Sequence, residues 1–123
     1  MPTSNRIDLI ELRADGADSV RAARDFYASA FGWDFTAYGP EYVDTTGSGT
    51  VLGINGTIGD PKLQAAPLAV LYVDDLEGAR DAVLAAGGVV LHDIYAFPGG
   101  RRFHFVDPAG NELAAWSEDP DAA

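Results

Sequence analysis

Apolar residues recur at helical spacing in two stretches of the chain. Residues three and four apart share one face of a helix, so the pattern predicts two amphipathic helices. Aspartate or serine before each stretch is a favoured helix cap, here Asp18 or Ser19 for the first helix and Asp74 or Asp75 for the second. The apolar positions are Val20, Ala23, Tyr27 and Ala30 in the first stretch, and Leu76, Ala79, Val83 and Ala86 in the second.

The two helical stretches are copies of one unit. Residues 18–33 align with residues 74–89 without a gap, at an offset of 56 (74 minus 18). Two such units nearly fill the chain, which indicates a duplication. The identical pairs are Asp18/Asp74, Ala23/Ala79, Arg24/Arg80, Asp25/Asp81, Ala30/Ala86 and Gly32/Gly88.

Short segments rich in β-branched and aromatic residues, separated by glycine and proline, predict one strand before each helix and three after it. Each half is then a βαβββ module. The predicted class is α+β, with two modules in tandem forming an open, curved, eight-stranded sheet around a central cleft. The expected strands cover residues 7–13, 33–38, 41–45 and 50–54 in the first half, and 68–73, 89–97, 102–106 and 112–118 in the second.

The length of 123 residues fits one domain over residues 1–123. Its repeats are expected at residues 6–54 and 67–118, with a linker rich in glycine, proline and alanine at 55–66. The chain has no apolar run of the roughly 20 residues that cross a bilayer, and its first residues do not form a secretory signal. We therefore expect a cytoplasmic protein.

Acidic residues dominate the charge. The 19 Asp and Glu residues against 8 Lys and Arg give a formal net charge of −11. Such a chain repels polyanions, so nucleic acid and anionic membranes are not expected partners, whereas cationic small molecules are attracted at long range. The absence of cysteine excludes disulfides, thiolate nucleophiles and cysteine metal ligands.

Several motifs, in order and spacing, resemble the vicinal-oxygen-chelate superfamily, which includes glyoxalase I, bleomycin-resistance proteins and extradiol dioxygenases. The chain resembles the small, single-domain, bacterial members that are described as glyoxalase-like. The resemblance covers about residues 6–118 and implies a glyoxalase-type fold and a homodimer. It rests on residues 23–27 (ARDFY) with 31–33 (FGW), 72–76 (YVDDL), 85–88 (AAGG) and 97–113 (FPGGRRFHFVDPAGNEL).

Catalytic relatives hold a divalent metal with His, Glu or Gln side chains from the first and last strand of each half. The resemblance maps three of these positions onto Leu9, Leu68 and Ala114, and the fourth onto residues 52–54 (LGI). Leucine and alanine have no lone pair to offer a metal. We therefore expect no metal and no cofactor. The two histidines, His92 and His104, have no obvious partner in the sequence, so a two-histidine metal site is not expected.

Strand alternation indicates which residues share a face with the mapped positions. For the strand at 102–106, the sequence does not decide which face lines the cleft. The predicted ligand-binding residues are Leu9, Glu11, Arg13, Leu68, Val70, Tyr72, Arg102, His104, Glu112, Ala114 and Trp116.

The carboxylates and the aromatic residues in this set each allow a functional and a structural interpretation. Glu11 stands in a mostly apolar run and could act as a general base or bind a cation, or form an ion pair at a strand end with Arg13 or another arginine. Trp116 and Tyr72 offer surfaces for stacking on a planar or cationic ligand, or belong to the core. Glu112 lines the cleft, completes the preceding turn or faces water.

The leading hypothesis is a protein of the glyoxalase and bleomycin-resistance type that binds a small organic molecule, cationic or aromatic, in the cleft without a metal. The alternative is an enzyme of the lyase, isomerase or dioxygenase type. It would use a metal with a shifted ligand set, or no metal and Glu11 as the best catalytic candidate. A third reading is an interaction module whose cleft is a relic.

Overall fold

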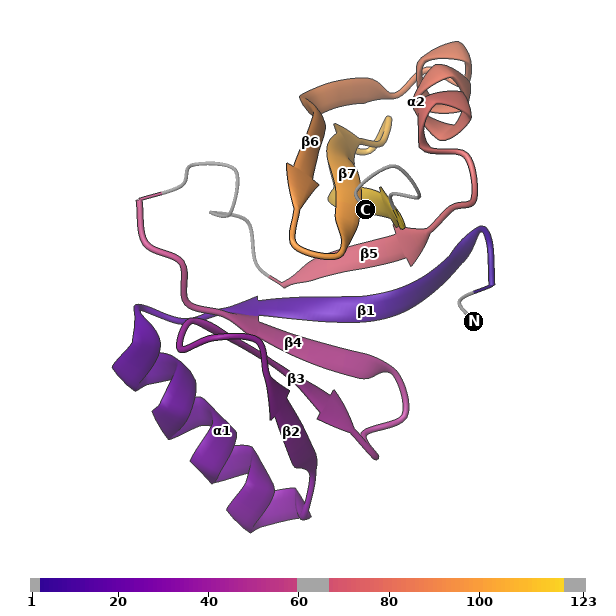
Figure 1. Cartoon of the computed structure of the whole chain (residues 1–123). Coiled ribbons are helices and arrows are strands. Elements are labelled where there is room, and N and C mark those ends of the chain that lie inside the picture. Colours follow the sequence, from indigo (N-terminus) through magenta and orange to yellow (C-terminus); the bar gives the residue numbers. More distant parts are fainter. Residues whose placement is uncertain (1–2, 60–66, 119–123) are drawn as a thin grey trace. The chain divides into compact units, whose positions relative to one another are not determined.

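The computed structural model describes residues 3–59 and 67–118, which form eight strands and two helices (Figure 1). The α+β class and the two βαβββ modules are confirmed. The strands agree with the expected ranges to within one or two residues. The elements are β1 (Arg6–Arg13), α1 (Ala17–Phe31), β2 (Asp34–Ala37), β3 (Tyr42–Thr46), β4 (Val51–Asn55), β5 (Leu68–Tyr72), α2 (Leu76–Ala85), β6 (Val89–Phe97), β7 (Gly100–Val106) and β8 (Glu112–Ser117).

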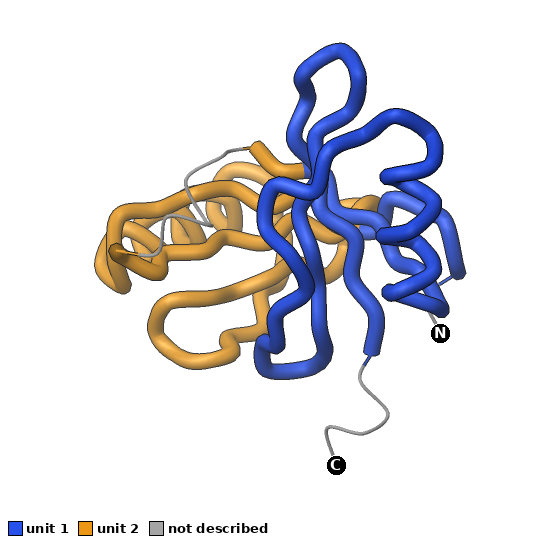
Figure 2. Tube along the Cα trace, turned by 90° about the horizontal axis from the view of Figure 1, so that it is seen from above, with its two compact units in different colours: residues 1–8, 69–123 blue, residues 9–68 orange. Residues whose placement is uncertain are grey.

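The chain forms two compact units (Figure 2). Unit 1 consists of residues 1–8 and 69–123, and unit 2 of residues 9–68. The strand order is β5-β8-β7-β6 in unit 1 and β2-β3-β4-β1 in unit 2. Each order contains one parallel pair, β5 with β8 and β1 with β4, and its other neighbours are antiparallel. The duplication in the sequence is therefore a duplication of strand connectivity.

In unit 1, α2 packs on one face of the strands. The centre of this core is Phe103, whose side chain is 0 % exposed, together with Val73, Leu76 and Ala115. Side chains alternate along a strand, so the neighbours of Phe103 and Ala115 point to the opposite face. We call the sheet face opposite the helix of a unit its helix-free face.

In unit 2, α1 packs on the strands through Val20, which contacts the buried side chains of Val43 and Ile54. Tyr27 of the same helix packs against this core and stacks on Trp33, with ring centroids 5.4 Å apart. The apolar stripe predicted for the first helix is thus the one that meets the sheet.

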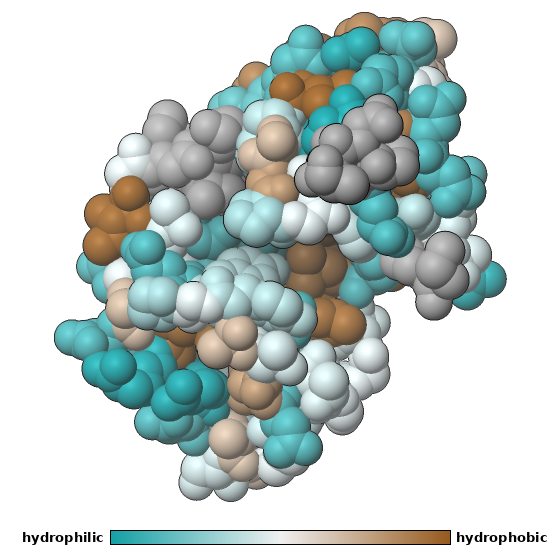
Figure 3. All heavy atoms as spheres, viewed as in Figure 1, coloured by the Kyte–Doolittle hydropathy of each residue, from teal (hydrophilic) through white to brown (hydrophobic). Residues whose placement is uncertain are grey.

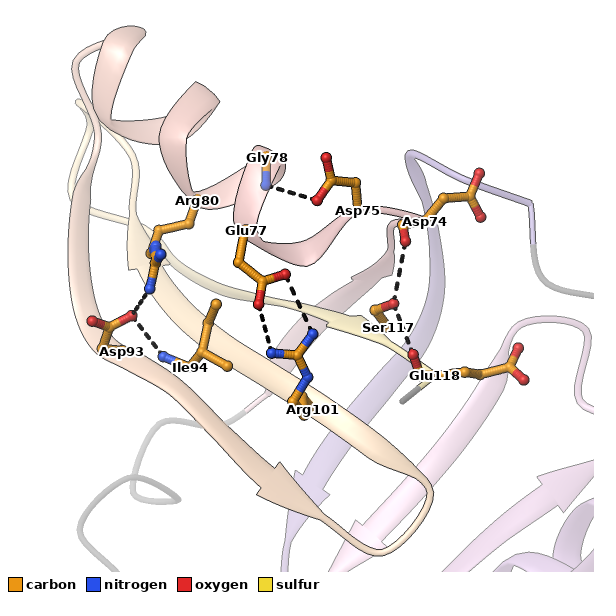
Figure 4. A network of polar contacts seen from close by, with 10 residues as sticks. All are labelled: Asp74, Asp75, Glu77, Gly78, Arg80, Asp93, Ile94, Arg101, Ser117 and Glu118. Atoms are coloured by element: carbon orange, nitrogen blue, oxygen red, sulfur yellow. Dashed lines mark hydrogen bonds and ion pairs between the residues drawn. The ribbon is translucent and has the colours of Figure 1, made fainter. Parts of the chain in front are cut away.

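The two helices begin in different ways. The carboxylate of Asp75 caps α2 by accepting a hydrogen bond from the Gly78 amide at 3.0 Å (Figure 4). The cap predicted for α1 is wrong, because α1 begins after Gly16, which has no side chain to cap with, and Asp18 lies inside the first turn. The Gly16 amide instead donates to the Gly56 carbonyl at 3.1 Å, so the start of α1 is fixed by the strand that leads to Gly56.

Exposed ion pairs connect α2 to the strands beneath it (Figure 4). Arg101 on β7 binds Glu77 at 2.7 Å, and Arg80 binds Asp93 on β6 at 2.8 Å. On the face shown in Figure 3, apolar residues are scattered among hydrophilic ones, as is usual on globular proteins. Within residues 3–59 and 67–118, no helix is long and apolar enough to cross a membrane. Most of the expected linker (60–66) and the last five residues (119–123) lie outside the described part of the chain.

Candidate ligand-binding site

Seven of the predicted ligand-binding residues share the helix-free face of unit 1. Cross-strand pairing sets them side by side: Val70 pairs with Ala114, Tyr72 with Trp116, Arg102 with Trp116, and His104 with Ala114. The structure thus decides the orientation that the sequence left open, because Phe103 belongs to the helix side and Arg102 and His104 do not. The seven residues are Val70, Tyr72, Arg102, His104, Glu112, Ala114 and Trp116.

Aromatic rings gather around Trp116 on this face. The Tyr72 ring meets it edge to face, with centroids 5.0 Å apart, and the Phe97 ring lies at 6.2 Å. The indole nitrogen of Trp116 donates to the carboxylate of Asp8 at 3.1 Å. The indole is half-buried, so it combines a fixed orientation with an accessible surface.

A chain of hydrogen bonds crosses the same face from β7 through β6 to β8. Arg102 Nε donates to the Tyr95 hydroxyl at 2.6 Å, the hydroxyl lies 2.7 Å from His104 Nε2, and His104 Nδ1 lies 2.8 Å from Glu112 Oε2. A carboxylate only accepts, so in the neutral imidazole Nδ1 carries the proton and Tyr95 donates to Nε2. The imidazole of His104 is 0 % exposed, and its two ring nitrogens are both satisfied.

Burial lowers the pKa of His104 below its ordinary value, and the neighbouring Arg102 guanidinium acts in the same direction. The hydrogen bond that His104 donates to Glu112 opposes this shift without cancelling it. His104 is therefore a neutral imidazole at physiological pH.

Two members of this cluster, His92 and Tyr95, were not among the predicted site residues. His92 pairs with His104, and Tyr95 pairs with Arg102, although three positions separate His92 from Tyr95 along β6. An irregularity in the register between them puts both on the helix-free face. Asp93 and Ile94 between them point to the helix side, where Asp93 meets Arg80 and Ile94 joins the core. Strict alternation, the only signal in the sequence, assigns His92 and Tyr95 to opposite faces.

Three predicted residues, Leu9, Glu11 and Arg13, lie on β1 in unit 2. In the register with β4, Leu9 pairs with Val51, Glu11 with Gly53 and Arg13 with Asn55. They point away from the core because Leu12 pairs with Ile54 on the helix side.

Glu11 is 3 % exposed, which makes it a deeply buried carboxylate. The Tyr42 hydroxyl lies directly over Gly53, where a β-carbon would collide with it. Arg13 donates to the Thr57 carbonyl at 2.6 Å.

The residues at the positions mapped from the metal-binding relatives do not fit a metal. Leu68 and Ala114 are buried hydrocarbon side chains, Leu9 is half-buried, and residues 52–54 are leucine, glycine and isoleucine. None of them offers a nitrogen or a charged oxygen. A different group has suitable atoms: His92, His104 and Glu112 each offer one ligand atom, all within 4.8 Å of one another.

Comparison with known proteins gives the family. Residues 7–115 match the model of the Glyoxalase/Bleomycin resistance protein/Dioxygenase superfamily. The chain belongs to this superfamily. The match covers most of the chain, including both modules, and confirms the resemblance seen in the motifs. No curated protein sequence matches this superfamily member.

Solved structures share the fold of this superfamily member. A structure described as an NAD-dependent benzaldehyde dehydrogenase from Legionella pneumophila has a TM-score of 0.73 and 13% identity, covering 90% of this chain and 98% of that one. Methylmalonyl-CoA epimerase from Mycobacterium tuberculosis has a TM-score of 0.71 and 12% identity, covering 99% and 95%. The Mn(II)-bound glyoxalase from Novosphingobium aromaticivorans has a TM-score of 0.64 and 20% identity, covering 95% of this chain and 40% of that one. Identities this low show a common fold and leave the activity to the site.

Proposed function

We propose that this superfamily member binds a small organic molecule and does so without a metal at the positions used by its metal-binding relatives. The observation that carries the proposal is the replacement of those ligands by Leu9, Leu68 and Ala114. Hydrocarbon side chains at these positions cannot coordinate an ion, and Leu9, which is half-buried, favours contact with an apolar part of a ligand.

The helix-free face of unit 1 supports a planar aromatic or cationic ligand. Trp116 is half-buried and held by Asp8, and the Tyr72 and Phe97 rings flank it. Aromatic faces attract planar rings and organic cations. The formal net charge of −11 raises the local concentration of a cation around the protein.

The test is ligand binding in a buffer that contains a metal chelator. A panel of cationic aromatic compounds is screened by thermal shift, and the best members are measured by calorimetry. We expect at least one compound to raise the melting temperature, and Trp116→Leu to remove that rise. Trp33→Leu, which changes the other tryptophan, is the matched control and should keep it. No stabilisation by any compound, or equal losses in both variants, would contradict the proposal.

A second candidate is a metal-independent enzyme with Glu11 as general base. It is favoured by the deep burial of this carboxylate on the helix-free face of β1, an environment that suits acid–base catalysis. A compound found in the screen is incubated with the protein and followed by mass spectrometry. Conversion by the wild type, lost in Glu11→Gln while binding persists, supports the enzyme; an unchanged compound excludes turnover of it.

We also propose a cytoplasmic homodimer. The dimer is supported by the resemblance to small superfamily members. Light scattering measures the mass in solution, and a monomer at all accessible concentrations would remove the dimer from the proposal.

A further inference from the structure

His92, His104 and Glu112 come from three successive strands, β6, β7 and β8. His92 and His104 are direct cross-strand neighbours, with ring centroids 5.1 Å apart and ring planes at 81°. Glu112 pairs with Val106, two positions along the ladder from the pair of His104 and Ala114, so it lies diagonally opposite His104 on the same face. The strand ladder therefore fixes the backbones of all three residues.

The distances suit a single ion. One ligand atom of each residue lies within 4.8 Å of those of the other two. Atoms bound to a tetrahedral ion at about 2.1 Å lie roughly 3.4 Å apart, so modest side-chain rotations bring the three donors to bonding distance. His104 Nδ1 and Glu112 Oε2 already stand 2.8 Å apart, and an ion would replace the proton that they share.

The surroundings resemble the support that metal ligands receive in proteins. A metal-bound histidine usually has its second ring nitrogen held by a hydrogen bond. Here the Tyr95 hydroxyl holds His104 Nε2 at 2.7 Å, and Arg102 holds that hydroxyl in turn. His104 is buried, whereas His92 is half-buried and the Glu112 side chain is 20% exposed, so an ion has a route from solvent.

We propose that His92, His104 and Glu112 form a binding site for one divalent transition-metal ion. Two imidazoles and one carboxylate select zinc, cobalt, nickel or ferrous iron over magnesium and calcium, which prefer oxygen ligands. Three protein ligands leave a coordination position open for water or a small molecule. The site uses β6, β7 and β8, and none of the positions mapped from the relatives.

This inference is independent of the proposed ligand binding and departs from the expectation that the chain binds no metal. That expectation rested on Leu9, Leu68 and Ala114 at the mapped positions. The separate expectation against a two-histidine site rested on the histidines having no obvious partner in the sequence, and the structure places Glu112 and His92 beside His104. The Arg102 guanidinium opposes a cation here, and the Glu112 carboxylate offsets that charge. A metal titration measures whether binding by the three ligand atoms exceeds the electrostatic repulsion from Arg102.

The experiment uses the untagged chain, stripped with a chelator and dialysed. Cobalt(II) is titrated and its visible absorption bands recorded, and zinc is then added in competition and measured by calorimetry. We expect one cobalt per chain, displaced by one zinc, with no displacement by excess magnesium. No cobalt bands together with no heat from zinc, or displacement by magnesium, would overturn the proposal.

Variants locate the ion. His92→Phe keeps a planar aromatic ring at this half-buried position, and Glu112→Gln keeps an oxygen that accepts from His104 Nδ1. Both should therefore fold, which circular dichroism checks. We expect each to lose cobalt binding. Tyr95→Phe should weaken binding by about 10–100-fold, as the loss of a supporting hydrogen bond does.

The control is Glu77→Gln, which changes a carboxylate on α2 that binds Arg101, and it should bind like the wild type. Wild-type affinity in both His92→Phe and Glu112→Gln would overturn the proposal. No organic ligand enters this experiment, and the compound screen contains a chelator. Failure of the metal site and failure of the proposed function are therefore observed separately.

Discussion

The two units share a strand order and differ in the chemistry of their helix-free faces. Unit 1 carries the hydrogen-bonded series Arg102, Tyr95, His104 and Glu112, in which the imidazole is fully buried. In the first module the corresponding face carries Glu11 opposite Gly53. The faces that meet the helices are apolar in both units. The two units therefore share the packing of helix on sheet and differ on the opposite face.

The largest expected loss of stability comes from a core substitution in unit 1, compared with a smaller one in the core of unit 2. Phe103→Ala removes the largest fully buried side chain of unit 1 and leaves a cavity, so we expect a loss of about 3–5 kcal/mol in unfolding free energy. Ile54→Val, a smaller deletion in the core of unit 2, should cost about 0.5–1.5 kcal/mol. Urea denaturation measures both. A Phe103→Ala cost no larger than that of Ile54→Val would show that the unit 1 core repacks around the loss.

The next largest loss of stability is expected at Gly100 in unit 1, where the backbones of β7 and β8 approach closely. A β-carbon on Gly100 would collide with the backbone carbonyl of Ser117 on β8, which cannot move without breaking the ladder. We expect Gly100→Ala to cost about 1–3 kcal/mol, as overpacking does. Ala96→Ser, an exposed change on the neighbouring β6, is the control and should be nearly neutral. Equal stability of Gly100→Ala and the wild type would show that the end of β8 at Ser117 shifts to make room for the β-carbon.

The helix starts differ by about one hydrogen bond. Asp75→Ala removes the cap of α2 and should cost about 1 kcal/mol. Asp18→Ala, at the position that matches Asp74 in the sequence repeat, removes no cap and should cost about 0.3 kcal/mol, from its exposed contact with Arg21. Thermal denaturation of the two variants gives the comparison, and equal losses would mean that Asp18 caps α1 in solution.

The smallest effect depends on pH. The hydrogen bond from Arg101 lowers the pKa of Glu77, so the folded chain holds this proton less tightly than the unfolded chain does. Its contribution is present above the ordinary carboxyl pKa and is lost as the pH falls through the lowered value.

Glu77→Gln should therefore flatten the fall in melting temperature between about pH 5 and pH 3. Because the pair is exposed, about 0.5 M salt should shrink the difference between variant and wild type. Identical pH profiles at low salt would show that the ion pair of Figure 4 contributes nothing to stability.

The order of helices and strands can be predicted from the sequence. Helix periodicity, glycine and proline breaks and the aligned repeat predict ten elements in their order, because each reflects local chemistry. The start of α1 escapes this reasoning, since Gly16 is held by a contact with Gly56, forty residues away. Only the fold brings such residues together.

The candidate site was predictable where strands are regular and lost where they are not. Alternation correctly groups Glu112, Ala114 and Trp116 on regular β8. It fails on β6, where the irregular register turns both His92 and Tyr95 to the same face. Neither residue type nor spacing in the sequence marks that irregularity, so the partners of His104 stayed hidden.

The surroundings of Ala114 limit which substitutions this position can accept. It pairs directly with His104, and both side chains are completely enclosed. A glutamate placed at 114, where the metal-binding relatives have a ligand, would need the space that the imidazole fills. Building the coordination of the relatives into this chain therefore requires at least two coordinated replacements. A single-substitution library at this position should be tolerant only of the smallest residues, which keeps the present arrangement isolated from that of its relatives.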